Sequence, residues 1–149
     1  MRRWRAGRSS RDTGSVLLLV PAGLLVLLVL GAIAVDSAVV FLAERDLSNR
    51  TAAVANDVAA ASTDDAAFYL HGGEVRLDPE AVSAYTAGVF GPARLPGGYD
   101  GWSATAEVDG ARVTVTAQAQ VHLVFAPAIP GVRRRASVRA RAVATARGG

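Results

Sequence analysis

The segment from Val16 to Val35 contains twenty consecutive residues without a charged side chain. An α-helix rises about 1.5 Å per residue, so this segment measures roughly 30 Å, the hydrocarbon thickness of a lipid bilayer. Buried helices of water-soluble domains rarely contain so long an apolar run. We therefore expect residues 16–35 to form a transmembrane helix, and the rest of the chain to be attached to that helix.

The residues before the apolar run indicate its orientation. Residues 1–15 carry five arginines and one acid, Asp12. Basic residues next to a membrane span stay in the cytoplasm, so residues 1–15 are expected to form a basic cytoplasmic leader. Asp36 then marks the membrane exit, and the C-terminal domain is extracytoplasmic. The second arginine cluster, near the C-terminus, lies about 100 residues further on, too far to reverse the orientation.

A signal peptide is the alternative interpretation of the N-terminal region. Ala32-Ile33-Ala34 resembles a cleavage site with small residues, and its use would release a secreted soluble protein without residues 1–34. The apolar run is longer than the 7 to 15 residues of a typical signal-peptide core, which favours an anchor.

The helical pattern continues beyond the apolar run. Neither glycine nor proline occurs between Ala32 and Ala61, and alanine, the best helix former, is frequent there. Residues 36–62 are therefore expected to extend the membrane helix as an amphipathic helix, giving one helix from about Val16 to Ala61. The C-terminal domain or a neighbouring subunit must cover its apolar stripe, which contains Val40, Leu47, Thr51, Val54, Val58 and Ala61.

Residues 63–101 are expected to form a short helix and a loop. Asp78-Pro79-Glu80 combines an N-cap acceptor, a proline at the first helical position and an acid in the first turn. The helix should end near Gly91-Pro92, because the following residues to Gly101 are rich in glycine and proline.

From Trp102 the apolar residues alternate with polar ones, as in β-strands. Asp109-Gly110 predicts a tight hairpin turn, and the residues 126–131, APAIPG, a second turn. Residues 102–147 are thus expected to form a three-stranded antiparallel meander with one apolar face. The side chains predicted to face inward are Val113, Val115, Ala117, Ala119, Val121, Leu123 and Phe125, then Val132, Ala136, Val138, Ala140, Ala142 and Ala144.

These elements predict a membrane-anchored α+β protein. A long N-terminal helix precedes a short helix and the β-meander, and one or both helices should cover the apolar face of the sheet. Such an arrangement would be like that of a pilin head.

Several features of the N-terminal region occur in a fixed order: the arginines before Gly14-Ser15, the early Pro21, the exit Ala34-Val35-Asp36, and the later Arg45, Leu47 and alanine-rich residues 55–61. In these features, which cover about fifty residues, the chain resembles the N-terminal module of the TadE/TadG-like proteins of Flp (tight-adherence) pilus systems. The resemblance implies a single-span component of the pilus machine without catalytic activity. It also implies a prepilin-type processing site, with Gly14 as the last leader residue and Ser15 as the first mature one. Leu19 replaces the glutamate of the pseudopilin pattern, which favours an uncleaved TadG-like anchored subunit over a polymerising pseudopilin.

The sequence offers few groups for catalysis or metal binding. It contains no cysteine, which excludes disulfides and thiolate chemistry. We expect His71 and His122 to be solvent-exposed residues, because no nucleophile or third group accompanies either. Asp57, Asp64 and Asp65 lack the spacing of a calcium loop. We therefore expect no enzymatic activity, cofactor or metal.

The net charge of +3 and the pI near 10.2 reflect arginines gathered at the two ends of the chain. Arginines 133–141 are expected to form a charged, solvated strand that opposes edge-to-edge aggregation. The alternative is contact with an anionic surface or an acidic partner. Outside the membrane, nucleic acid is not an expected partner. The expected partners are the lipid bilayer and other pilus or secretion subunits, with helix–helix self-association as a further contact.

Overall fold

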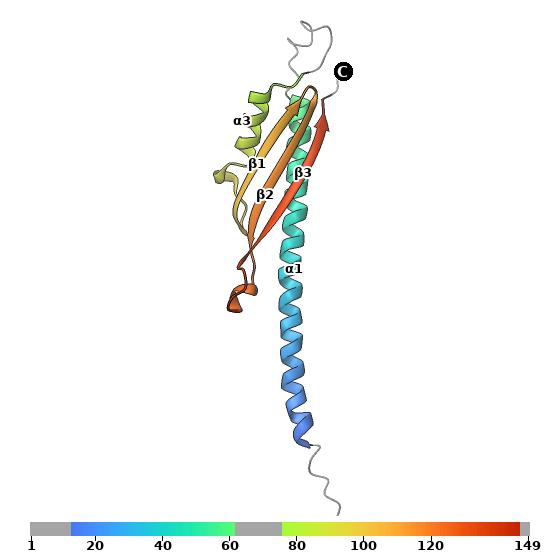
Figure 1. The fold of residues 1–149 in the computed structure, drawn as a ribbon, viewed down its shortest axis with the longest axis vertical. Helices are drawn as coiled ribbons and strands as arrows, with labels where there is room; N and C mark the ends of the chain where they lie inside the picture. Colours follow the sequence, from blue (N-terminus) through green and yellow to red (C-terminus); the bar gives the residue numbers. More distant parts are fainter. Residues whose placement is uncertain (1–12, 62–75, 147–149) are drawn as a thin grey trace, which may run out of the picture.

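The structure, a computed structural model, describes residues 13–61 and 76–146, with side chains from residue 19 onward in the first helix. Its order is α1 (Thr13–Ala61), α3 (Pro79–Val89), a 3-10 turn η1 (Pro92–Arg94), β1 (Tyr99–Asp109), β2 (Arg112–His122), a 3-10 turn η2 (Ala126–Ala128) and β3 (Arg135–Thr145). The predicted long helix, short helix and three-stranded antiparallel sheet are confirmed. Figure 1 shows the sheet and the short helix, which together form the head, packed along one half of the long helix, whose other half extends beyond them.

Helix α1 is continuous over 49 residues, about 73 Å at the ordinary helical rise, and passes through Pro21 without ending. Its two halves differ in their surroundings. No described side chain from Leu19 to Leu42 is buried, whereas Ala43, Leu47 and Val58 lie in the core. The exposed half is long and apolar enough to cross a membrane.

Helix α3 begins as the Asp78-Pro79-Glu80 pattern predicts. The Asp78 side chain accepts a hydrogen bond from the Glu80 backbone N–H at 2.9 Å, and Pro79 occupies the first helical position. Val82 and Thr86, four residues apart, are the buried residues of α3, and the Thr86 hydroxyl donates to the Val82 carbonyl at 2.8 Å. This face packs on β1.

The sheet is a meander of order β1-β2-β3. Strand β1 starts at Tyr99, three residues earlier than the predicted Trp102, and a bulge lies between Tyr99 and Gly101. The first hairpin loop consists of Gly110 and Ala111, because Asp109 still pairs with Arg112. Only Gly110 has a positive φ there, of 59°, as at the first position of a type II′ turn. The prediction that Asp109 and Gly110 would form the turn is therefore shifted by one residue.

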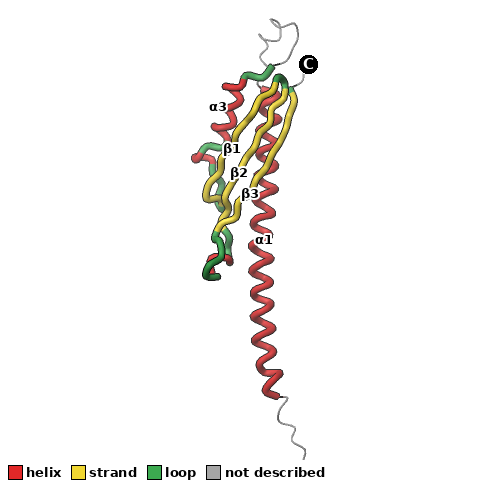
Figure 2. The backbone as a smooth tube through the Cα atoms, viewed as in Figure 1, coloured by secondary structure: helices red, strands yellow, loops and turns green. Residues whose placement is uncertain are grey.

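The core lies between the apolar face of the sheet and the two helices. Helix α1 packs on β2 and β3, and α3 packs beside it on β1, so that the helices form one layer and the sheet the other (Figures 1 and 2). The fully buried side chains include Val113, Val115 and Val121 of β2. On α1, the hydroxyl of the buried Thr51 donates to the Leu47 carbonyl at 2.6 Å. This bond satisfies the hydroxyl, so a threonine can occupy a position in the apolar stripe.

Three predicted inward positions are wrong. Ala61 is exposed at the end of α1. Phe125 and Val132 are also exposed, because the pairing of β2 with β3 stops at His122 and Arg135. The chain between them leaves the sheet and turns through η2, so the strand alternation no longer determines where their side chains point.

Candidate functional site

The loop between β2 and β3 contacts α1 through Asp36. The carboxylate accepts backbone N–H bonds from Val124 at 2.8 Å and Phe125 at 3.0 Å on Oδ1, and from Ala126 at 2.7 Å on Oδ2. These donors include the first residue of η2. One side chain of α1 thus holds a loop some ninety residues away in the sequence.

The electrostatics of this contact favour the ionised carboxylate. The Phe125 N–H lowers the pKa of Asp36 below its ordinary 3.8, and the Ala126 and Val124 N–H groups act in the same direction. Partial removal from water opposes them, but the net direction is downward. Asp36 is therefore charged at neutral pH and binds the loop as an anion.

An apolar groove of about 500 Å³ lies between this loop and α1. On the helix side it extends from Val40 past Asp36 to Leu25. The loop side is formed by apolar residues, Leu123, Phe125, Ala126, Ala128, Ile129 and Val132. The large apolar side chains of the loop are about half exposed: Val124 59%, Phe125 44%, Ile129 52% and Val132 46%.

A second polar cluster lies at the same end of the sheet. Arg135 Nε is 2.7 Å from Asp100 Oδ2, and His122 Nδ1 is 3.4 Å from the same oxygen. The three residues come from β3, β1 and β2, so the ion pair links the start of β1 to the start of β3 across His122. All three side chains are at least partly exposed, which makes a stabilising contribution small.

A third cluster fastens α1 to β1. The Tyr99 hydroxyl donates to the Ala43 carbonyl at 3.2 Å and to Asp46 Oδ2 at 3.0 Å. Burial, and then the bond to Asp46, raise the pKa of Tyr99 to about 12, so it stays neutral as a donor. Arg50 Nε binds Asp46 at 2.9 Å, and its guanidinium lies 5.7 Å from the centre of the Trp102 ring. These contacts hold the head at a fixed position on the helix.

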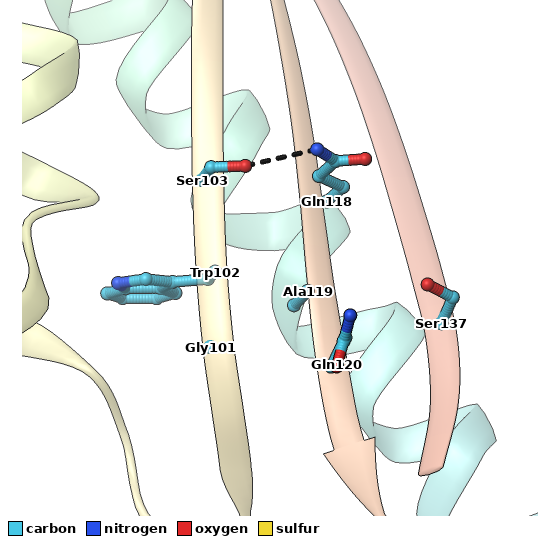
Figure 3. Close-up of a pocket in the computed structure, with 7 residues that line it drawn as sticks. All are labelled: Gly101, Trp102, Ser103, Gln118, Ala119, Gln120 and Ser137. Carbon is cyan, nitrogen blue, oxygen red and sulfur yellow. Dashed lines mark hydrogen bonds between the residues drawn. The ribbon is translucent and has the colours of Figure 1, made fainter. Parts of the chain in front are cut away.

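The solvent face of the sheet carries a shallow hollow of about 320 Å³ (Figure 3). Gln118 Nε2 donates to Ser103 Oγ at 3.2 Å, while the indole of Trp102 points away to the side of β1. Ser137 and Gln120 complete its polar lining, which contains no titratable side chain. Within residues 13–61 and 76–146, no group of three metal-ligating side chains is found.

The residues considered for function in the sequence analysis lie in different parts of the chain. Gly14 and Ser15 lie in the first turn of α1. His71, Asp64 and Asp65 fall outside the described residues, and His122 is on the polar sheet face, beside Asp100 rather than alone. Asp57 accepts a hydrogen bond from the Tyr85 hydroxyl at 3.2 Å, which links α1 to α3.

The predicted arginine-rich strand divides into two parts. Arg139 and Arg141 lie on the exposed face of β3, while Arg133 and Arg134 precede the strand, directly after the apolar loop. The groove itself was not predicted from the sequence. Its signal is the run from Leu123 to Val132, which contains no polar side chain, although the local pattern predicts only a strand end and a turn there.

Comparisons of the chain with protein-family models, curated proteins and solved structures find no match. The candidate site therefore rests on its own geometry.

Proposed function

We propose that this chain is a non-enzymatic, single-span envelope protein, a TadE/TadG-like component of an Flp-type pilus or related secretion apparatus. It acts by helix packing and subunit contacts. Its N-terminus lies in the cytoplasm and its head outside the membrane.

The observation that carries the proposal is the division of α1. One half packs into the core of the head, and the other half, from Leu19 to Val35, exposes apolar side chains along its whole length. A helix that is hydrophobic all round requires an apolar environment, which a bilayer supplies. Because α1 is continuous, the head is held directly above that environment.

The apparatus is proposed from the module that α1 resembles and from the shape of the chain. A long helix that carries a small helix-on-sheet head suits a subunit that contacts others through its helix and its head. Leu19, where the pseudopilin pattern has glutamate, favours a fixed anchored subunit over a fibre subunit.

The groove favours the anchored form over the secreted alternative. Cleavage after Ala34 would remove Leu25, Leu28 and Ile33, which form one wall of the groove. The apolar residues of the β2–β3 loop would then face water on both sides.

Mass spectrometry of the mature chain, recovered separately from the membrane and soluble fractions, tests the proposal. An intact N-terminus is expected, both in the wild-type chain and in a Gly14→Val variant. A chain that begins at Ser15, and is lost in that variant, would identify a processed pseudopilin instead. A chain that begins at Val35 in the soluble fraction would overturn the membrane anchor.

Loss of the protein tests the apparatus. Cells without it should lose surface pili or secretion, and the wild-type chain should restore them. Unchanged pili and unchanged secretion would contradict the assignment to this apparatus.

A further inference from the structure

The β2–β3 loop has the composition of a membrane-embedded segment. All ten residues from Leu123 to Val132 have apolar side chains or are glycine. The loop lies below the sheet and beside α1, toward the exposed apolar half of the helix (Figure 1). Four of its large side chains remain about half exposed, so the protein itself does not cover them.

We propose that residues 123–132 insert into the headgroup–acyl boundary of the lipid bilayer, with lipid acyl chains filling the groove between this loop and α1. The inference rests on the proposed function in one respect, that α1 spans the membrane. It adds a second membrane contact, made by the head itself.

The depth of the loop follows from its attachment to Asp36. Asp36 ends the apolar run and binds the backbone at residues 124–126. The groove then continues along α1 to Leu25, eleven residues earlier in the sequence. That length of helix measures about 16 Å, close to half the hydrocarbon thickness. The groove thus lies alongside the outer half of the membrane span.

Most backbone N–H groups of the loop have acceptors within the protein, as a medium without water requires. In lipid, an unpaired N–H group is costly, so irregular segments at this depth need internal partners. Asp36 receives three N–H groups of the loop. Ala128 donates to Phe125 at 2.9 Å, Ile129 to Ala126 at 3.1 Å, and Val132 to Ile129 at 3.3 Å.

The remaining positions follow the same pattern. Leu123 donates to the Arg134 carbonyl at 3.0 Å. Pro127 and Pro130 have no N–H to satisfy. Among residues 123–132, Gly131 is thus the one N–H group for which no acceptor is found within the described part of the chain. A water-exposed loop has no need of internal partners for nearly all its N–H groups, because water satisfies its donors.

The charges beside the loop fit lipid headgroups. Arg133 and Arg134 follow Val132 directly, and both are exposed. Arginine side chains at a membrane surface attract lipid phosphates while their aliphatic stems stay near the apolar layer. The change from ten apolar residues to arginines therefore matches the change from acyl chains to headgroups. If a second copy of the chain covered the loop instead, arginines directly after the apolar residues would not be required.

Single-cysteine labelling tests this placement, since the chain contains no native cysteine. Full-length Ile129→Cys protein is labelled with an environment-sensitive nitrobenzoxadiazole probe. It is then reconstituted into vesicles of phosphatidylcholine and phosphatidylglycerol. The emission should shift to the blue, and lipids with a nitroxide on the acyl chain should quench it several-fold more strongly than the label at Thr105→Cys. Thr105 is the matched control, because it is exposed on the polar face of the sheet.

A probe at Leu27→Cys separates the two proposals. If the Leu27 probe is quenched by lipid and the Ile129 probe behaves like Thr105, α1 spans the membrane and the loop inference is wrong. If both probes are as water-exposed as Thr105, the membrane-spanning proposal itself fails. An Ile129 probe shielded from water but not quenched by lipid, together with cross-linking between copies, would show a second copy in the groove and overturn the inference.

Discussion

At the scale of single residues, Asp36 does more than end the apolar run of α1. Its carboxylate receives three backbone N–H groups from one loop, an arrangement in which a charged acceptor gives stronger bonds than a neutral one. The residue joins two parts of the fold that lie some ninety positions apart in the sequence. The position of the loop relative to α1 therefore depends largely on one side chain.

Replacement of this carboxylate tests that dependence. In an Asp36→Asn variant, the side-chain NH₂ group replaces one acceptor oxygen, so a donor faces a backbone donor. Hydrogen exchange of the Val124, Phe125 and Ala126 amides should become much faster, while exchange in β2 is unchanged. The control is Asp57→Asn, which removes an exposed carboxylate from the same helix and loses only the bond from Tyr85. Equal protection in the two variants would contradict the role of Asp36.

Acidification of the wild-type protein should likewise make hydrogen exchange of the Val124, Phe125 and Ala126 amides faster than expected from pH alone. The pKa of Asp36 is lower in the folded protein than its ordinary 3.8, so the ionised form stabilises the contact between the β2–β3 loop and α1. This contribution is fully present above 3.8. It decreases as the pH falls below that value and is lost once the pH is below the folded pKa. Amide protection in the loop that declines well above the ordinary pKa would contradict the direction of the shift.

At the scale of elements, α1 belongs to two environments that divide near Ala43. Leu47 is completely buried beneath the sheet, whereas Leu42, five residues earlier, is 62% exposed. The same residue type in the same helix therefore has two roles. One supports the packing of the head, and the other faces solvent or a partner.

Alanine substitution at these two leucines compares the roles. Leu47→Ala should reduce the free energy of unfolding by about 2–5 kcal/mol, because it removes buried methyl groups and leaves a cavity. Leu42→Ala should change it by less than about 0.5 kcal/mol. Urea unfolding of the full chain in detergent, followed by circular dichroism, measures both. Similar losses in the two variants would show that α1 does not divide at this position.

The elements themselves could be predicted because their signals are local. The uninterrupted apolar run, the spacing of Leu47, Val54 and Val58, and the Asp78-Pro79 start each depend on a few neighbouring residues. Strict alternation from Val113 to Val121 likewise predicts which side of β2 is buried. In each of these segments, local preference and tertiary packing agree.

The site was predicted only in part, because its contacts are long-range. The sequence indicates Asp36 only as the boundary of the apolar run, since nothing near it in the sequence indicates three donors from residues 124–126. The sequence predicts Phe125 in the sheet interior because it continues the alternation of β2. The pairing that would enforce this alternation ends at His122, and no local pattern marks that end.

At the scale of the whole molecule, the head is built so that its folding needs only part of α1. Among the residues that the structure describes, every buried one lies at Ala43 or beyond. The contacts of Tyr99 with Ala43 and Asp46 also lie within this region. The apolar half of α1 therefore extends from the head without contributing to its core.

A shortened chain tests this separation. A chain that begins at Asp36 should fold in aqueous buffer, with a mixed helix–sheet circular dichroism spectrum and a cooperative thermal transition, because it keeps the whole described core. A chain that begins at Ala52 is the control. It lacks Ala43, Leu47 and Thr51, and the loss of several buried side chains should prevent folding. The Asp36 chain should also associate with vesicles or with itself, since Phe125, Ile129 and Val132 lose the helix wall opposite them. An unfolded Asp36 chain would show that the apolar half of α1 is part of the folding unit.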